Sequence, residues 1–276
     1  MHQSEIVRYY DETEIDYRLV WNLKKSLAMH LGYWDETVSN LSQSLARENQ
    51  VLSQIAKIKK FETVLDAGCG VGGTAIFLAK SFNCKVTGIA LGENQVIESR
   101  ENAKRLGVQN LTSFFQMDFE RMDFESTFDV VLAIESACHA RSKKTFVKNA
   151  FRALKSGGRL LIADGFVVKD HYNQTEEMQN WLSGWGVDSL ETAENFKNFA
   201  QEVGFSSVFF TDVTNNVIPS SKRLYKLSFP ASFLGKIAKF IRVRTEVQNK
   251  NIIAARYQYI ALMQKLWQYG FFLAIK

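Results

Sequence analysis

The sequence predicts an α/β fold: a doubly wound, mainly parallel sheet of seven strands with helices on both faces. The first observation is that short strand-like runs alternate with helical patterns from Phe61 to Asp170, which is typical of repeated strand–helix crossovers. The second is that two further strand-like runs follow near the end of the chain. The third is the helical character of residues 1–60. With 276 residues, 46% of them hydrophobic, the chain is expected to form one elaborated domain.

The strands and helices are predicted from the apolar runs, in chain order. Five strands read ETVLDAG, CKVTGIA, LTSFFQM, FDVVLAIE and GRLLIADGFVV, and the helical segments between them include NQVIESRENAKRLG and KKTFVKNAFRALKSGG. GFSSVFFTDV and QYGFFLAIK are predicted as the last two strands, with a helix over NIIAARYQYIALMQKLWQY. Because sheets of this kind bind ligands at the carboxyl ends of their strands, we expect the functional site there.

Composition and spacing exclude several classes of protein. No apolar run has the length of a membrane span, and the N-terminal residues lack a signal-peptide core, so we expect a cytoplasmic protein. The three cysteines have neither zinc-site nor disulfide spacing, so we expect no metal. The net charge is +5, but no nucleic-acid-binding motif accompanies it, so no nucleic-acid partner is expected.

The most informative stretch is VLDAGCGVGGTAIFLA, from Val64 to Ala79. Gly68, Gly70 and Gly73 match the spacing of a dinucleotide-binding turn, but Asp66 would then face a pyrophosphate, and two like charges in a partly dry cleft repel each other. A ligand with ammonium and sulfonium groups, such as S-adenosylmethionine, suits that carboxylate. The glycines would let the backbone approach it closely.

The residues at the end of the second strand also bear on the choice between a dinucleotide and S-adenosylmethionine. Dinucleotide sites, and many methyltransferases, hold the ribose with an acid there, whereas this chain has Ala90 at that place, followed by Leu91 and, in the turn, Gln95. The chain therefore resembles the class I S-adenosylmethionine-dependent methyltransferases, in the branch with cyclopropane fatty acid synthases, tocopherol methyltransferases and sterol C24-methyltransferases. Its ALGENQ is similar to the TLSxxQ-like turn of that branch. The resemblance implies a Rossmann-like fold and a ribose contact by Gln95.

Further motifs carry the resemblance to the adenine site and the acceptor. In QMDFERMDF it implies that Asp118 and Phe119 bind the adenine, and Ile134, at the end of the fourth strand, is also assigned to the cofactor site. DFERMDFESTFDVVLAIESACHA is similar to the corresponding region of sterol C24-methyltransferases, and HLGYW, residues 30–34, to the HHGFW of tocopherol methyltransferases. A cysteine, Cys138, replaces the glutamate that precedes the active-site histidine of cyclopropane synthases, which argues against bicarbonate-dependent cyclopropanation.

The candidate catalytic residues are His139, Glu135 and Tyr33. Alkylation of an alkene or an aromatic ring needs a dry pocket, aromatic faces and a base, and His139 with Glu135 is expected to supply the base and its electrostatic partner. Tyr33 and Trp34, together with Trp181 and Trp185 in WLSGW, are expected to line the pocket. The alternatives are a structural His139, a Glu135 that binds the amino group of the cofactor, and catalysis by proximity alone.

A basic segment without acids extends from Val213 to Thr245. Within residues 231–244 apolar side chains fall on one helical face, and Lys236, Lys239 and Arg242 on another. This pattern is typical of a helix on an anionic membrane surface and equally of a lid with a solvated back. We therefore expect a cytoplasmic enzyme with peripheral membrane contact through 231–244.

The resemblance also implies the domain organisation and the activity. Residues 1–60 are expected to close over the cofactor, and residues 61–276 to form the S-adenosylmethionine-binding domain, with a helical substrate cap at about 171–195 and 215–268. The expected reaction is methylation, on carbon, of an isoprenoid or aromatic lipid, with S-adenosylhomocysteine as the product. The alternatives are an N- or O-methyltransferase of a specialised metabolite and a binding module without activity. The sequence indicates no oligomeric state.

Overall fold

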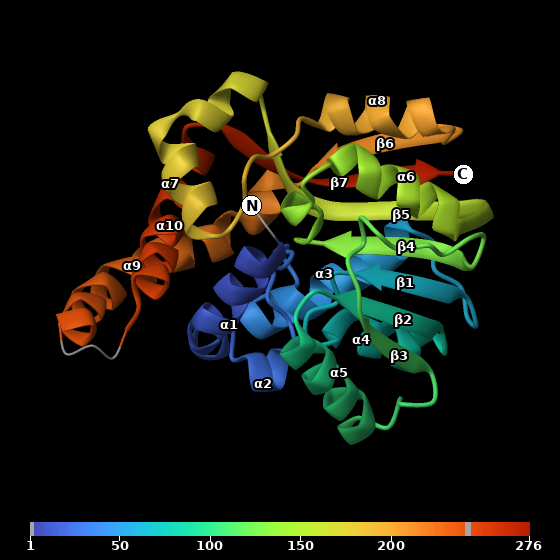
Figure 1. Cartoon of the computed structure of the whole chain (residues 1–276), viewed down its shortest axis with the longest axis horizontal. Coiled ribbons are helices and arrows are strands. Elements are labelled where there is room, and N and C mark those ends of the chain that lie inside the picture. The colour runs from blue at the N-terminus through green and yellow to red at the C-terminus, as the bar shows by residue number, and fades with distance from the viewer. Residues whose placement is uncertain (1–2, 241–243) are drawn as a thin grey trace.

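The computed structural model describes residues 3–240 and 244–276, which contain a seven-stranded sheet in the order β3-β2-β1-β4-β5-β7-β6 (Figure 1). The predicted doubly wound α/β fold is thus confirmed. The strands are β1 (Thr63–Ala67), β2 (Lys85–Ala90), β3 (Thr112–Gln116), β4 (Phe128–Ile134), β5 (Leu154–Val167), β6 (Ser207–Asp212) and β7 (Trp267–Ile275). Only β7 runs antiparallel to its neighbours, β5 and β6, among these strands.

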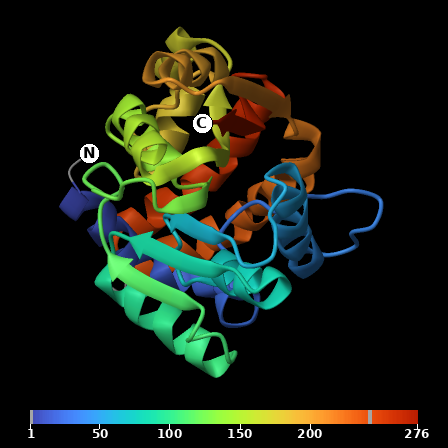
Figure 2. The ribbon, with the colours of Figure 1, turned by 90° about the vertical axis from the view of Figure 1, so that its right-hand side faces the viewer.

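Most residues of the central strands are buried because helices cover both faces of the sheet, as Figure 2 shows. Val64 and Leu65, adjacent on β1, are both buried and belong to two separate apolar cores. The core around Leu65 is completed by α6 (Lys143–Ala153) and α8 (Ala193–Val203). The core around Val64 is completed by α3 (Leu41–Ile55), α4 (Gly73–Phe82), α5 (Glu93–Arg105) and the helices of the cap.

The cap lies beyond the carboxyl ends of the parallel strands and consists of helices from the second half of the chain (Figure 1). These are α7 (Glu176–Gly184), α9 (Thr214–Phe240) and α10 (Glu246–Met263), preceded by the 3-10 turn η2 (Asp170–Gln174). From the N-terminal region, α1 (Gln3–Val20) and α2 (Leu23–Ser26) pack at the same end. The helical character predicted for residues 1–60 and for the cap is therefore present.

One predicted helix boundary is wrong. The helix expected over residues 251–269 ends at Met263, and Trp267 already begins β7. The chain turns at Lys265, which has a φ of 58°, and Leu266 donates back to the carbonyl of Ala261. Pairing of Trp267 with Val167 on β5 then outweighs the helical pattern of the local sequence.

Candidate active site

The glycine-rich turn joins β1 to α4 and lies next to the turn that follows β4. Gly68 has a φ of 99°, and a Cβ there would lie 2.3 Å from the Cβ of Ser136, so only glycine fits. Ser136 Oγ in turn donates to the carbonyl of Ala67 at 2.6 Å. Gly70 has a φ of 51°, and a Cβ there would lie 3.0 Å from the methyl of Met29. The turn thus exposes backbone to a cleft between β1, β4 and the N-terminal region.

This cleft has a volume of about 140 Å³ and unites most of the predicted cofactor residues. Its walls include Asp66, Gly68, Gly70, Ala90, Leu91, Gln95, Phe119, Ile134 and Glu135. Tyr10, Asp11 and Glu14 close it from α1. These side chains lie along one cleft because the parallel strands β1, β2 and β4 end at the same edge of the sheet.

The surroundings of the Asp66 carboxyl favour a cationic ligand. The residue is 2% exposed, and burial raises the pKa of its carboxyl to about 7, although the backbone N–H of Ala75 and the charge of His30 oppose the shift. Its Oδ2 has no hydrogen-bond partner among the described residues. An ammonium group would both satisfy this oxygen and favour the carboxylate form, so the site fits the amino-acid end of S-adenosylmethionine.

For Asp118, the resemblance implies a contact with the adenine. It follows β3, and its Oδ1 accepts from the backbone N–H of Glu120 at 2.8 Å, while Oδ2 lies 3.7 Å from Arg121. It is not among the residues that line the cleft, although Phe119 is. The carboxylate therefore stabilises the turn after β3, and its contact with the adenine stays a prediction.

Glu135 belongs to a buried polar cluster that the sequence did not reveal. Its Oε1 accepts from the backbone N–H of Leu31 at 2.6 Å and lies 3.0 Å from the hydroxyl of Tyr269, which also contacts Glu48 at 2.9 Å. Burial, reinforced by the charge of Glu48, raises the pKa of Glu135 to about 8. Glu135 also has a φ of 45°, a strained backbone that presents its carboxyl to the cleft.

His30 completes this cluster. Its Nδ1 lies 2.5 Å from Oε2 of Glu48, and both side chains are buried. Burial alone would lower the pKa of His30, but the charges of Glu48, Glu135 and Asp66 raise it above its usual value. Nε2 of His30, on the wall of the cleft, has no hydrogen-bond partner within the described part of the chain. The motif HLGYW was the available signal for His30; Glu48, inside α3, had none.

A second, larger cavity adjoins the cleft. Its volume is about 580 Å³, and Tyr10, Tyr17, Met29, Glu135 and His139 line both spaces. The remaining wall is mostly apolar and aromatic, with Leu31, Trp181, Leu182, Trp185, Leu190, Leu224, Ile252 and Trp267 among its residues. The expectation that Trp181 and Trp185 line a pocket is confirmed. The volume is in the usual range for small-molecule sites.

His139 lies at the junction of the two spaces, in the 3-10 turn η1 (Ala137–His139). Its Nδ1 is 3.1 Å from the carbonyl of Gly186, and because a carbonyl only accepts, this contact assigns the proton to Nδ1. Nε2 then accepts from the hydroxyl of Tyr10, 2.9 Å away on α1. Burial lowers the pKa of His139 to about 4, so the imidazole is neutral at pH 7. Sequence reasoning missed Tyr10.

Tyr33 lines neither cavity. Its ring stacks on Phe271 at 6.0 Å, and its backbone N–H donates to the carbonyl of Ser44. Trp34 also turns away, since its indole donates to Oγ of Ser220 at 2.8 Å. These contacts correct the expectation that the two aromatics form the pocket, because the loop before α3 is anchored to α3 and β7 instead.

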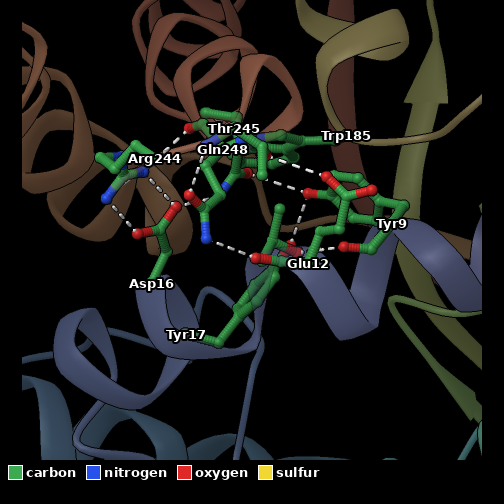
Figure 3. Close-up of polar contacts among 10 residues, drawn as sticks. Tyr9, Glu12, Asp16, Tyr17, Trp185, Arg244, Thr245 and Gln248 are labelled. Atoms are coloured by element: carbon green, nitrogen blue, oxygen red, sulfur yellow. Dashed lines mark hydrogen bonds and ion pairs between the residues drawn. The ribbon is translucent and has the colours of Figure 1, made fainter. Parts of the chain in front are cut away.

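Helix α1 covers the junction and is tied to the start of α10 (Figure 3). Asp16 receives two hydrogen bonds from Arg244, at 2.9 and 2.8 Å, and Gln248 donates to the carbonyl of Glu12 at 2.8 Å. Arg244, at the end of the expected membrane-contact segment, is therefore paired with Asp16 within the protein. The side chains of residues 236–240 and all of 241–243, which include Lys236, Lys239 and Arg242, lie outside the described residues.

Comparisons with known proteins agree with this geometry. The chain is 29% identical over 237 residues to a sterol 24-C-methyltransferase of Eremothecium gossypii; the match covers 83% of this chain and 62% of the relative. It is also 29% identical over 203 residues to an O-methyltransferase of Aspergillus sclerotiorum, with 72% of this chain and 76% of the relative covered.

The fold and the family follow from two further matches. The solved structure of the cyclopropane synthase MmaA2 from Mycobacterium tuberculosis superposes with a TM-score of 0.83 at 14% identity, covering 100% of this chain and 99% of that one. The family model described as a methyltransferase domain matches residues 58–241, more than half of the chain. The chain spans about three fifths of the length of that sterol 24-C-methyltransferase, and it belongs to the methyltransferase domain family.

Proposed function

We propose that the protein methylates a carbon atom of an apolar small molecule, an isoprenoid or an aromatic lipid. The observation that carries the proposal is the cavity of about 580 Å³, whose apolar and aromatic wall shares residues with the cofactor cleft. Similarity to the sterol 24-C-methyltransferase supports a carbon acceptor. Similarity to the O-methyltransferase supports the second candidate, methylation of a hydroxyl on a specialised metabolite.

The proposed cofactor contacts follow from the walls of the cleft. Asp66 and Glu135 would hold the ammonium group, Gln95 the ribose and Phe119 the adenine ring. When bound, S-adenosylmethionine supplies a methyl group on a positively charged sulfur. Carboxylates beside the cleft and the aromatic rings Tyr10 and Tyr17 between the two spaces favour positive charge there. Residues 1–60 would act as the cover of the cofactor, since α1 lines the cleft.

Proton removal is assigned to the pair His139 and Tyr10. The neutral imidazole presents the Nε2 lone pair to the Tyr10 hydroxyl. Tyr10 lines both spaces, so its oxygen can take a proton from the acceptor while its own proton moves to Nε2. Burial raises the pKa of Tyr10 well above its usual value, so the phenol transfers a proton only together with the imidazole and does not ionise by itself.

A labelled-methyl assay against apolar and polar extracts, with mass spectrometry of the product, tests the proposal. We expect label in an apolar product, on carbon. Label on oxygen or nitrogen would favour the second candidate, and cofactor binding without label in any fraction would favour a binding module.

The base is tested by His139→Ala and Tyr10→Phe. We expect His139→Ala to lower single-turnover rates by about 10²–10⁴-fold while S-adenosylhomocysteine affinity changes only a few-fold. Tyr10→Phe keeps the ring on the wall of both spaces and removes only the hydroxyl, so a similar loss would place the proton path through Tyr10. Unchanged rates in both variants would show that His139 and Tyr10 only line the site and that catalysis depends on proximity and orientation without a base.

Peripheral membrane contact is also proposed, as the route by which an apolar acceptor reaches the cavity. Large apolar side chains are exposed on α1, at Ile15 and Leu19 on the cavity rim, and on α9, at Phe229 and Phe233. None of the helices, as far as the structure describes them, could cross a bilayer.

The membrane proposal predicts salt-sensitive sedimentation with anionic liposomes. Replacement of Lys236, Lys239 and Arg242 by glutamate should abolish it, since each basic residue near an anionic surface contributes about 1 kcal/mol. The same change at Lys104, on α5, serves as the control. If the wild-type protein does not sediment with such liposomes at low salt, the proposal is contradicted.

A further inference from the structure

One buried phenol lies between two carboxyls beside the cofactor cleft. The hydroxyl of Tyr269, on β7, is 2.9 Å from Oε1 of Glu48 and 3.0 Å from Oε1 of Glu135. Tyr269 and Glu48 are fully buried, and Glu135 lies on the wall of the cleft. A phenol carries a single proton, so it can donate a full hydrogen bond to only one of the two carboxyls.

The other of these two contacts requires a further proton. If both carboxyls were ionised, one of them would face the lone pairs of the phenol oxygen without a donor, which is costly in a buried place. If one carboxyl is protonated, it donates to the phenol oxygen while the phenol donates to the other carboxyl, and both contacts are hydrogen bonds. The geometry is therefore that of two carboxyls that share one proton through Tyr269.

The cluster offers only one cation to these two carboxyls. Nδ1 of His30 lies 2.5 Å from Oε2 of Glu48 without the alignment of a hydrogen bond, so the two groups interact through their charges. In residues 3–240 and 244–276, the hydrogen-bond partners of Glu135 are the backbone N–H of Leu31 and the hydroxyl of Tyr269, and neither is charged. The shared proton thus takes the place of a second cation.

The surrounding groups favour this proton at neutral pH. Those that interact with Glu135 come from several elements: Glu48, His30, Asp164, Tyr10, Tyr17, Cys138 and Tyr269. Burial, with the charges of Glu48 and Asp164, raises the pKa of Glu135 to about 8, although the charge of His30 and the N–H of Leu31 oppose the shift. The tyrosines and the thiol are neutral at pH 7, because burial raises the pKa of each.

We propose that Glu48 and Tyr269 are positioning residues for the cofactor, which share one proton with Glu135 until the ammonium group of the cofactor displaces it. On binding, the O–H bond of the protonated carboxyl breaks, a buffer base takes up the proton, and the ammonium group faces Glu135. His30 and the ammonium group then supply one cation for each carboxylate.

Glu48 and Tyr269 act through Glu135, since neither of them lines the cofactor cleft. The inference rests on the proposed contact between Glu135 and the ammonium group. It adds that the two residues decide in which protonation state Glu135 meets the ligand.

The test counts the protons released when S-adenosylhomocysteine binds, by calorimetry at pH 7 in two buffers of different ionisation enthalpy. In Glu48→Gln, an amide of the same shape donates to the Tyr269 oxygen and the like charge is removed, so Glu135 is ionised before the ligand arrives. We expect the wild type to release about one proton more than this variant. Protons from Asp66 are common to both proteins and cancel in the difference.

The ligand control is methylthioadenosine, which lacks the amino-acid end and should displace no proton. In the wild type alone, the two ligands should differ by about one and a half protons, of which Asp66, with a pKa of about 7, supplies about half a proton. This comparison decides the proposal even if Glu48→Gln does not fold. A difference of half a proton or less would overturn it.

The pH profile gives a second readout. Low pH keeps the pair protonated, so the affinity of the wild type for S-adenosylhomocysteine, relative to that of Glu48→Gln, should fall by up to about tenfold from pH 7 to pH 6. Glu101→Gln, exposed on α5, is the matched control and should behave as the wild type. Equal proton counts or parallel pH profiles in the wild type and Glu48→Gln would each contradict the shared proton.

None of these measurements needs turnover. Equal proton counts together with an apolar product methylated on carbon would reject the shared proton alone. The expected proton counts without such a product would reject the proposed function alone.

Discussion

Replacement of Asp66 by asparagine should make the ligand-free protein more stable at pH 8. Burial raises the pKa of this carboxyl from 3.8 to about 7, so folding opposes its ionisation. Below pH 3.8 the group is protonated in the folded and unfolded states and costs nothing. As the pH rises towards 7 the unfolded state ionises first, and stability is lost. Asparagine keeps the shape and an oxygen that can accept from Ala75, but does not ionise.

The size of the effect follows from the shift. Each pKa unit corresponds to about 1.4 kcal/mol, so the wild-type carboxyl costs about 4 kcal/mol at pH 8 and about 2 kcal/mol at pH 5. These values are upper limits, since relaxation around the charge reduces them. For a chain of this length, about 4 kcal/mol corresponds to roughly 10 °C in Tm.

The assay is thermal unfolding of the wild type and of Asp66→Asn at pH 5 and pH 8 without cofactor, with exposed Asp123→Asn as control. Calorimetry with S-adenosylhomocysteine should meanwhile show lost binding in Asp66→Asn, because the ammonium group loses its carboxylate. A variant less stable than the wild type at pH 8, or a stability difference equal at both pH values, would refute the argument from burial.

Three further outcomes are expected. Gly68→Val should abolish S-adenosylhomocysteine binding in calorimetry, since its Cβ would lie 2.3 Å from that of Ser136; retained binding would contradict the close approach of the turn. His30→Gln should weaken S-adenosylhomocysteine about tenfold and leave methylthioadenosine, which lacks the amino-acid end, unchanged, because the raised pKa of His30 favours a positive charge on the cleft wall near that end; equal losses would contradict this. Arg244→Met should accelerate release of S-adenosylhomocysteine in stopped-flow experiments, because Asp16 on α1 loses both hydrogen bonds from Arg244; an unchanged rate would show that α1 is held by its other contacts.

The positions of the cofactor residues could be predicted because they depend on local sequence. An apolar run that ends in Asp66 and breaks into glycines specifies a strand and a sharp turn, and parallel strands bring their carboxyl ends to one edge of the sheet. Gln95 and Phe119 follow the ends of such strands, so their place in the cleft does not depend on how distant segments pack. His139 and Glu135, in the turn after β4, were predictable for the same reason.

The remaining parts of the site depend on packing between segments far apart in the chain. Tyr10 reaches His139 across 129 positions, and Glu48 reaches Tyr269 across 221, contacts that no local period encodes. Tyr33 was misplaced because stacking on Phe271 decides where its ring points. The sequence by itself thus determined the strands, the glycine turn and the cofactor edge, since short-range sterics and apolar periodicity specify them. Only the tertiary structure decided which side chains of α1, α3 and the cap meet there, because those contacts form when the helices pack.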